Sequence, residues 1–433
     1  AGINARIEIK HINASHPNTY RLVLSNACEQ HVLTAISTGG GMIEVVEIDG
    51  FSVAIGGDYR ETLIYTDTDG PAMVQHLAET DLADDVLLHE SENTCLVEIK
   101  ALQFLDAPVI QDLRTRFSIQ AIKQLEPVLP VLSRRDLTVP FASCEQMLAY
   151  KGDRDWPLWQ LGLAYETMRG DLTEQAVLDR MVDIVRVLRG SVEQGLQGTD
   201  YEDRILGPQS GGFAEKLSQG HLLEAGLLNR IILYVSAIME VKSAMGVIVA
   251  APTAGACAAL PGACLAAGDQ LGLSDEDVAR ALLAGGIIGM FIATDSTFAA
   301  EVAGCQAECG AAAGMAAAAL VTMGGGTTEQ AVAAASMALQ NSLGMVCDPV
   351  ANRVEAPCLG KNVMAASNAL SCANMAMAGY DQVIPLDEVI ETMDRVGRSL
   401  PHELRCTALG GLSITPTSKK IEKRLKEATT RRT

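Results

Sequence analysis

One stretch of the sequence, residues 299–321, restricts the possible folds more than any other. Alanine and glycine make up 14 of its 23 residues. Small side chains let two helices approach closely, so such a tract is typical of the central helix of a tightly packed bundle. The whole chain is 48% hydrophobic but only 4% aromatic, so its core must be built from small aliphatic side chains and methionine. These features predict an α-helical bundle.

Two segments, residues 244–268 and 281–321, are apolar enough to raise the question of a membrane span. They contain prolines and carboxylates that a lipid environment would penalise, namely Pro252, Pro261, Asp295, Glu301 and Glu308. We therefore predict buried helices of a protein core and no membrane partner. No secretory signal precedes Ala1, so we expect a cytoplasmic protein.

The N-terminal region has a different pattern. Residues 6–51 alternate between apolar and polar side chains in short runs bounded by Asn, Pro and Gly, which is typical of antiparallel strands. The runs are residues 6–10, 20–24, 32–36 and 42–48. The glycines at positions 39–41 allow a tight turn and a close approach of the backbone to a ligand. We expect residues 1–60 to form a small, partial α+β domain.

Residues 61–132 follow the order strand, helix, strand, strand, helix, strand, which is the ferredoxin-like plan. The expected strands are residues 62–66, 86–89, 95–99 and 119–125, and the expected helices are residues 71–78 and 107–117. Such a module is either purely structural or a site for a small ligand. Residues 133–142 are the predicted linker to the next domain.

From residue 143 to 416 the pattern is almost entirely helical. Apolar residues recur at helical spacing in residues 144–151, 156–169, 173–196 and 221–244, and capping signals begin at Ser274 and Thr327. The run Ser210-Gly211-Gly212-Phe213 is expected to interrupt the helices as a glycine loop, with Ser210 and Gly211 as candidate substrate contacts. Residues 417–433 form a basic tail, interpreted as a solvated terminal helix.

The net charge and the cysteine content exclude some classes of function. A formal net charge of −20 argues against nucleic acid as a partner, because phosphates bind basic surfaces. The eleven cysteines show no regular framework, which favours reduced thiols, some of them metal-bound, over disulfides. Cys305, Cys347 and Cys358 lie beside Gly, Pro or short polar residues, at spacings that fit neither a zinc ribbon nor a ferredoxin. Taken alone, each of these residues is more typical of a buried packing cysteine than of a metal ligand.

Three motifs add a family resemblance. They are Glu301-Val-Ala-Gly-Cys305-Gln-Ala-Glu308, then Cys-Asp-Pro-Val from Cys347, then Pro-Cys-Leu-Gly-Lys-Asn ending at Asn362. In this order and at these intervals they resemble the catalytic part of the iron-sulfur-dependent L-serine dehydratases. Residues 251–255, Ala-Pro-Thr-Ala-Gly, resemble another motif of that family. The resemblance implies that Cys305, Cys347 and Cys358 hold a [4Fe-4S] cluster.

The same resemblance implies a lyase of amino-acid catabolism and gluconeogenesis that converts L-serine to pyruvate and ammonia. An open iron of the cluster would act as a Lewis acid on the substrate hydroxyl. Thr253, Ala254, Gly255 and Asn362 would contact the substrate. Cys309, one helical turn after Cys305, is a possible fourth ligand, although the absence of a terminal cysteine favours an open iron.

The N-terminal region also resembles this family. His16-Pro17-Asn18, followed by Ser37 and the glycines that include Gly39 and Gly40, resembles the small, beta-type part of the enzyme. This implies His16 as the catalytic base, with Glu301 and Glu308 as carboxylate alternatives, and Ser37, Gly39 and Gly40 as substrate contacts. The chain departs from the family because the usual upstream Gly-Pro-Ser-Ser-Ser-His-Thr motif is not present, so we expect the site residues that this motif supplies in the family to come from elsewhere.

Residues 61–132 resemble the ACT-type regulatory domain of some family members, which implies an amino-acid effector and a homodimer. Three readings stay open from the sequence: serine dehydration, the same cluster acting on cysteine or threonine, and a non-catalytic amino-acid sensor. The sequence does not choose between hydroxyl and thiol leaving groups, because it does not give the volume of the pocket.

Overall fold

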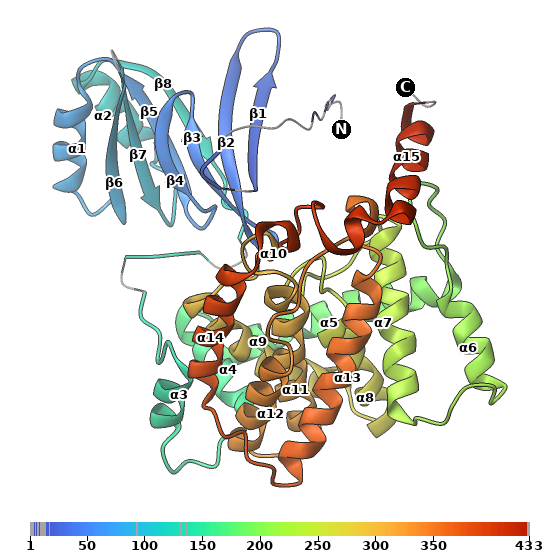
Figure 1. Cartoon of the computed structure of the whole chain (residues 1–433). Helices are drawn as coiled ribbons and strands as arrows, with labels where there is room; N and C mark the ends of the chain where they lie inside the picture. Colours follow the sequence, from blue (N-terminus) through green and yellow to red (C-terminus); the bar gives the residue numbers. More distant parts are fainter. Residues whose placement is uncertain are drawn as a thin grey trace. The chain divides into compact units, whose positions relative to one another are not determined.

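The structure is a computed structural model that describes residues 4, 6, 8, 14–16, 18–91, 94–129, 132–135 and 137–430 (Figure 1). The chain divides into two compact units. One unit comprises residues 1–37 and 43–134, and the other comprises residues 38–42 and 135–433. The predicted strand at residues 6–10 lies largely outside the described residues.

The N-terminal unit contains two four-stranded sheets. The first has the order β1-β2-β3-β4, with bounds β1 Thr19–Ser25, β2 Gln30–Gly39, β3 Met42–Ile48 and β4 Phe51–Ile55. Its β1–β2 and β3–β4 pairs are antiparallel, as the alternating pattern predicts. Buried Phe51, Val53 and Ile55 of β4 pack with Leu63 and Leu96 of the second sheet.

The second sheet has the order β6-β7-β5-β8. Its elements are β5 Arg60–Thr66, α1 Gly70–Ala78, β6 Asp85–Ser91, β7 Thr94–Ala101, α2 Ala107–Arg116 and β8 Ile119–Leu125. This chain order and strand order are those of a ferredoxin-like βαββαβ unit, so that prediction is confirmed. Ile64, Val97 and Ile99 form a second core with Met73 and Leu113 of the two helices.

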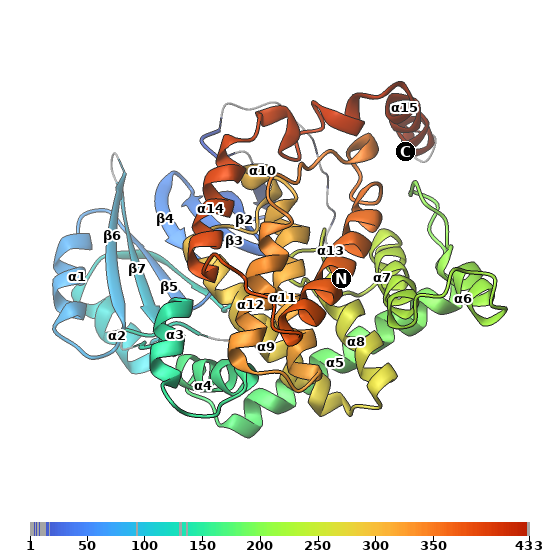
Figure 2. The same ribbon diagram turned by 60° about the horizontal axis from the view of Figure 1, so that its bottom comes forward.

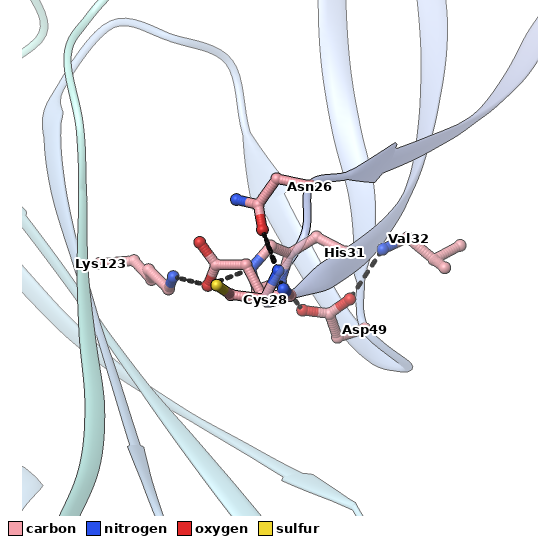
Figure 3. Close-up of polar contacts among 7 residues, drawn as sticks. Asn26, Cys28, His31, Val32, Asp49 and Lys123 are labelled. Carbon is pink, nitrogen blue, oxygen red and sulfur yellow. Dashed lines mark hydrogen bonds and ion pairs between the residues drawn. The ribbon is translucent and has the colours of Figure 1, made fainter.

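Polar contacts also connect the two sheets of this unit (Figure 3). A hydrogen bond of 2.7 Å joins the ring of His31 in β2 to the carboxyl of Asp49. Glu29 contacts both His31 and Lys123 of β8. The hydrogen bond to Asp49 raises the pKa of His31. These exposed contacts join the first sheet to the edge of the second.

The second unit is a helical bundle (Figures 1 and 2). Its α-helices are α3 Cys144–Lys151, α4 Leu158–Gly170, α5 Glu174–Gln197, α6 Ser210–Ser218, α7 Leu227–Ser243, α8 Ala259–Leu271, α9 Asp275–Asp295, α10 Ala300–Ala303, α11 Ala311–Met323, α12 Thr328–Gln340, α13 Cys358–Met377, α14 Leu386–Ser399 and α15 Pro416–Thr430. Short turns of other helix types are η1 Gln306–Gly310, η2 Val350–Asn352, η3 His402–Leu404 and η4 Gly411–Ile414.

Helix α11 lies at the centre of this bundle, packed against α8, α9, α12 and α13 (Figure 2). Its alanines are almost completely buried. A Cβ atom at Gly285 of α9 would lie 2.9 Å from the carbonyl oxygen of Met315, so the close packing of α9 on α11 depends on a missing side chain. Among the described residues, α9 alone is long and apolar enough to cross a membrane, and 67% of its apolar window is buried inside the protein.

Most predicted helices agree with the structure to within two residues, and the capping boxes at Ser274 and Thr327 are present. The glycine loop predicted at residues 210–213 is wrong, because these residues form the first turn of α6. Glu240 of α7 accepts hydrogen bonds from the N–H groups of Gln209 and Ser210, which satisfies the start of the helix despite its two glycines. The helix predicted at residues 221–244 begins only at Leu227.

Candidate metal centre

Three motif residues meet at one buried point of the helical unit. One ligand atom each of Cys305, Glu308 and Cys347 lies within 4.8 Å of the others. Cys305 directly precedes η1, a single π-helical turn that connects α10 to α11, and such turns are frequent at functional sites. Cys305 and Cys347 are only 1% and 2% exposed. Two soft thiolates beside a carboxylate suit iron or zinc better than magnesium or calcium.

Cys358, the third predicted ligand, is the first residue of α13 and is 4% exposed. It lies outside the tight group but close enough to interact electrostatically with Cys305 and Glu308. Burial raises the pKa of its thiol to about 12, and these negative neighbours add to the effect. A helix N-terminus favours a thiolate once a metal replaces the proton.

The thiols at this point hydrogen-bond to one another. Those of Cys309 and Cys347 donate to Cys305, which holds the pKa of Cys305 well below its usual range. The same hydrogen bonds raise the pKa values of Cys309 and Cys347. One sulfur in the group is therefore stabilised as a thiolate by its neighbours.

Two lysines supply positive charge to the centre. Lys361 bonds to Asp348 at 2.8 Å and to the carbonyl of Val346 at 2.7 Å. Burial alone would lower its pKa, but Asp348 and the thiol of Cys305 raise it. Lys242 of α7 is partly buried near Cys358, Cys257, Glu355 and Glu308, and burial lowers its pKa. A buried anionic group at this point would have cationic neighbours on two sides.

Glu308 is the carboxyl of the site and is partly buried. Its Oε1 accepts a 2.6 Å hydrogen bond from the hydroxyl of Thr253, which itself accepts the N–H of Ala256 at 3.0 Å. Burial, followed by the charge of Cys305, raises the pKa of Glu308 to about 8, and the nearby Glu301 adds to the rise. A Cβ atom at Gly255 would lie 2.5 Å from the same Oε1, so glycine is needed there for the carboxyl to fit.

Asn362 is fully buried and braces the site from α13. Its Nδ2 donates to the carbonyls of Gly255 and Cys358 at 2.8 and 2.9 Å, and its Oδ1 accepts the N–H groups of Ala258 and Ala259. These bonds tie the Pro-Thr-Ala-Gly turn and the start of α8 to the start of α13. The structure thus gives Asn362 a positioning role, while the predicted substrate contact stays a prediction.

Comparison with known proteins places this sequence in a family. Residues 108–413 match the family described as serine dehydratase alpha chain. The chain belongs to the serine dehydratase alpha chain family. It is 36% identical over 285 residues to the probable L-serine dehydratase alpha chain of Bacillus subtilis (strain 168), which covers 66% of this chain and 95% of the relative.

Two further relatives carry related names. The L-serine dehydratase alpha chain of Peptoniphilus asaccharolyticus is 36% identical over 275 residues, covering 63% of this chain and 93% of the relative. L-serine dehydratase 1 of Escherichia coli (strain K12) is 31% identical over 290 residues, covering 64% of this chain and 62% of the relative. The resemblance inferred from the motifs is therefore confirmed.

In this serine dehydratase alpha chain family member, the predicted site residues fall into both units. His16 and Ser37 belong to the N-terminal unit, where the ring of His16 accepts the N–H of Asn18 at 3.1 Å through Nδ1. Gly39 and Gly40 belong to the helical unit. A Cβ atom at Gly39 would lie 2.8 Å from the nitrogen of Ala299. A Cβ atom at Gly40 would lie 2.9 Å from the carbonyl oxygen of Pro252, the residue next to Thr253.

The remaining predicted contacts are placed as follows. Ala254 is exposed, while Thr253 and Gly255 beside it are buried. Ser210 is buried, and its hydroxyl bonds to Glu240 and to the carbonyl of Gly195, whereas Gly211 is exposed. Ser210 therefore helps to fix α6 on α5 and α7. The substrate-binding roles of these residues stay predictions.

Sequence reasoning missed one thiol of this centre. Cys406 follows η3 and hydrogen-bonds to the thiol of Cys347. Its immediate neighbours are Arg405 and Thr407, not glycine or proline, and the surrounding residues do not repeat the other motifs. Nothing in the local sequence marks it as a site residue.

The helical unit also contains an apolar cavity of about 540 Å³ between α4, α5, α8 and α9. Leu188, Leu282, Met290 and Phe298 are among its lining residues, with Glu166 and Arg169 supplying charge. None of the four cysteines 305, 309, 347 and 358 lines it. Because no cysteine of the metal centre faces this cavity, the cavity is not the candidate site for thiolate chemistry.

Proposed function

We propose that this chain dehydrates and deaminates L-serine to pyruvate and ammonia. The observation that carries the proposal is the convergence of Cys305, Cys347 and Glu308 at one buried point, with Cys358 and two lysines beside it. Membership of the serine dehydratase alpha chain family supports it. So do the names of the relatives from Bacillus subtilis and Peptoniphilus asaccharolyticus, both L-serine dehydratase alpha chains.

We further propose that Cys305, Cys347 and Cys358 hold a [4Fe-4S] cluster. The donor set fits, since thiolates are the protein ligands of such clusters and the lysines offset the negative charge that a buried cluster brings. When bound with one iron lacking a protein ligand, the cluster supplies a Lewis acid for the substrate hydroxyl, which is a poor leaving group. The protein must supply the rest of the chemistry.

Removal of the Cα proton of serine needs a base. Glu308 holds its proton near neutral pH because burial raises its pKa to about 8, so it can exchange a proton in either direction under physiological conditions. Thr253 fixes the direction of its carboxyl. His16 is the alternative base, as the family resemblance implies, and Glu301 is a third candidate near Glu308.

The N-terminal unit suggests a regulatory role. We propose that its ferredoxin-like part is an ACT-type domain that binds an amino-acid effector in a cytoplasmic homodimer. We also propose that residues 1–60 are the small, beta-type part of the enzyme, with Ser37, Gly39 and Gly40 contacting the substrate. The observed βαββαβ topology supports the first of these proposals.

Anaerobic turnover of serine, threonine and cysteine, measured side by side on iron-reconstituted protein, tests the function. We expect pyruvate and ammonia from serine at the highest kcat/KM, together with visible iron-sulfur absorbance. Sulfide release from cysteine as the fastest reaction would show a desulfidase instead. A colourless protein that binds serine without turnover would show a sensor.

A further inference from the structure

Cys406 lies beside Cys347 because the backbones of the two segments pair. The N–H of Cys347 donates to the carbonyl of Leu404 at 2.8 Å, and the N–H of Cys406 donates to the carbonyl of Cys347 at 2.9 Å. Together they form an isolated parallel β-bridge between Cys347 and Arg405. A disulfide requires Cα atoms within roughly 4.4–6.8 Å, and a direct backbone hydrogen bond holds two residues in that neighbourhood.

The backbone at position 406 has an unusual conformation. In a strand, successive side chains point to opposite faces, so residue 406 would normally point away from its paired neighbour. Cys406 instead has φ of +59°, in the left-handed region that few non-glycine residues adopt. Its thiol hydrogen-bonds to that of Cys347.

Neighbouring contacts hold this segment in place. Arg405 donates to the carbonyl of Val302 in α10 at 3.2 Å, and Asp348 accepts the N–H of Leu412 at 2.9 Å. The pair of thiols is therefore fixed from both sides of the chain. A rigid pair in contact needs little rearrangement to form a bond.

Exposure distinguishes the two thiols. Cys347 is 2% exposed and Cys305 is 1% exposed, whereas Cys406 is only partly buried. A small oxidant dissolved in water therefore reaches Cys406 before it reaches either buried thiol. Access is one of the factors that set the rate of thiol–disulfide exchange.

We propose that, in the metal-free chain, Cys406 and Cys347 are a redox pair that closes to an intramolecular disulfide. The oxidant is a low-molecular-weight disulfide of the glutathione class. The sulfur of Cys406 attacks one sulfur of the oxidant, breaks its S–S bond and releases one thiol. The sulfur of Cys347 then attacks the Cys406 sulfur and releases the second thiol. The two cysteines lose two protons and two electrons, and the oxidant becomes two thiols.

This reaction would remove a proposed iron ligand reversibly. While Cys347 is in a disulfide it cannot bind iron, so the chain would take up no cluster until a reductant reopens the bond. This consequence rests on the proposed function, whereas the disulfide itself does not. It would also shield Cys347 from irreversible oxidation during iron loss.

Peptide mapping of the unmutated full chain tests the disulfide without any assay of activity. The metal-free protein is treated with oxidised glutathione, alkylated, and cut with trypsin and a glutamate-specific protease. Trypsin releases residues 406–419, and cleavage after glutamate places Cys305, Cys309 and Cys347 in three separate peptides. We expect residues 406–419 linked to the peptide that contains Cys347, and release of both by dithiothreitol.

Two variants sharpen the result. Cys28→Ser removes an exposed cysteine of the other unit and should leave the internal link intact. Oxidised Cys406→Ser should take up iron and sulfide to at least tenfold higher occupancy than oxidised wild type before any reductant is added. A disulfide between Cys305 and Cys347, free thiols at both 347 and 406, or equal iron uptake by the variant and wild type would overturn the proposal. Failure of serine turnover in reduced, iron-loaded protein would instead refute the proposed function.

Discussion

The two units bury their ionisable groups in opposite ways. In the second sheet of the N-terminal unit, Lys100 of β7 lies 3.0 Å from Glu98 and 3.4 Å from Glu61, and His89 of β6 lies 2.6 Å from Glu98. Each buried carboxyl group there lies beside a basic side chain. At the candidate metal centre of the helical unit, the thiol of Cys305 hydrogen-bonds to the thiols of Cys309 and Cys347, and the carboxyl of Glu308 is held by the hydroxyl of Thr253.

This difference separates a self-compensating network from a ligand site. The sheet network contains its own positive charge in Lys100, which lies beside both Glu98 and Glu61, although both oxygens of Glu61 and one of Glu98 accept no hydrogen bond. The helical unit instead gathers the thiols of Cys305 and Cys347 and the carboxyl of Glu308 at one point. Soft donors gathered in this way are what a metal cluster requires. Four predictions test this contrast, beginning with the largest effect.

Removing a proposed ligand should abolish the centre. We expect Cys358→Ser, in reconstituted protein, to lose the visible iron-sulfur absorbance and serine turnover together, because a cluster needs all three thiolates. Cys264→Ala is the matched control, since Cys264 is a fully buried cysteine in the alanine-rich helix α8. It should cost some stability and keep the iron. A full cluster in Cys358→Ser would remove Cys358 from the ligand set.

Replacing the carboxyl of Glu308 should affect chemistry but not iron. If Glu308 is the base, Glu308→Gln should lower kcat by roughly 10²–10⁴, the usual contribution of a general base, with normal iron content. Exchange of the serine Cα proton with solvent deuterium should fall in parallel. Glu215→Gln, on α6, is the control. His16→Ala is the decisive comparison. If Glu308→Gln turns over serine at the normal rate and His16→Ala does not turn it over, the base is His16 of the N-terminal unit.

The helical core should tolerate no added methyl group where helices touch. A Cβ atom at Gly195 of α5 would lie 2.3 Å from the carbonyl oxygen of Ala237 in α7, a backbone atom that cannot move alone. We expect Gly195→Ala to lower the free energy of unfolding by at least about 1–3 kcal/mol. Gly190→Ala in the same helix meets nothing within 4 Å and should be stabilising by roughly 0.5–1 kcal/mol. Urea unfolding followed by circular dichroism gives both values, and equal stability of the two variants would contradict the packing argument.

Glu61 of the sheet network should make the free energy of unfolding depend on pH. Burial raises the pKa of Glu61 to about 7 from 4.5. Between these values the unfolded chain loses the proton first, so Glu61 makes the protein less stable as pH rises from about 4.5 to 7, with no further change above. Glu61→Gln should therefore be more favourable, relative to wild type, at pH 8 than at pH 5.

Urea unfolding at the two pH values measures this effect. Glu90→Gln on β6 is the control, because Glu90 is exposed and belongs to the same sheet. A stability difference between Glu61→Gln and wild type that does not change with pH would show that Glu61 is not protonated in the folded protein near neutral pH.

Local sequence patterns determined much of this protein. The βαββαβ order, most helix bounds and the capping boxes follow from periodicity and from short-range hydrogen bonds, which act within a few residues. The alanine tract predicted a central helix because small side chains leave no other way to fill a core so densely. The motif cysteines 305, 347 and 358 were marked by their flanking residues and by resemblance, and the structure brings Cys305 and Cys347 together.

Only the tertiary structure decided the rest. Glycines at positions 211 and 212 predicted a loop, yet Glu240 from another helix caps the segment and makes it helical. Glu308 became the carboxyl of the site because Thr253 hydrogen-bonds to it and Gly255 leaves room for it, and Asn362 became a positioning residue. Cys406 joins Cys347 through a β-bridge between distant segments. Such contacts depend on the path of the whole chain, and no local pattern encodes them.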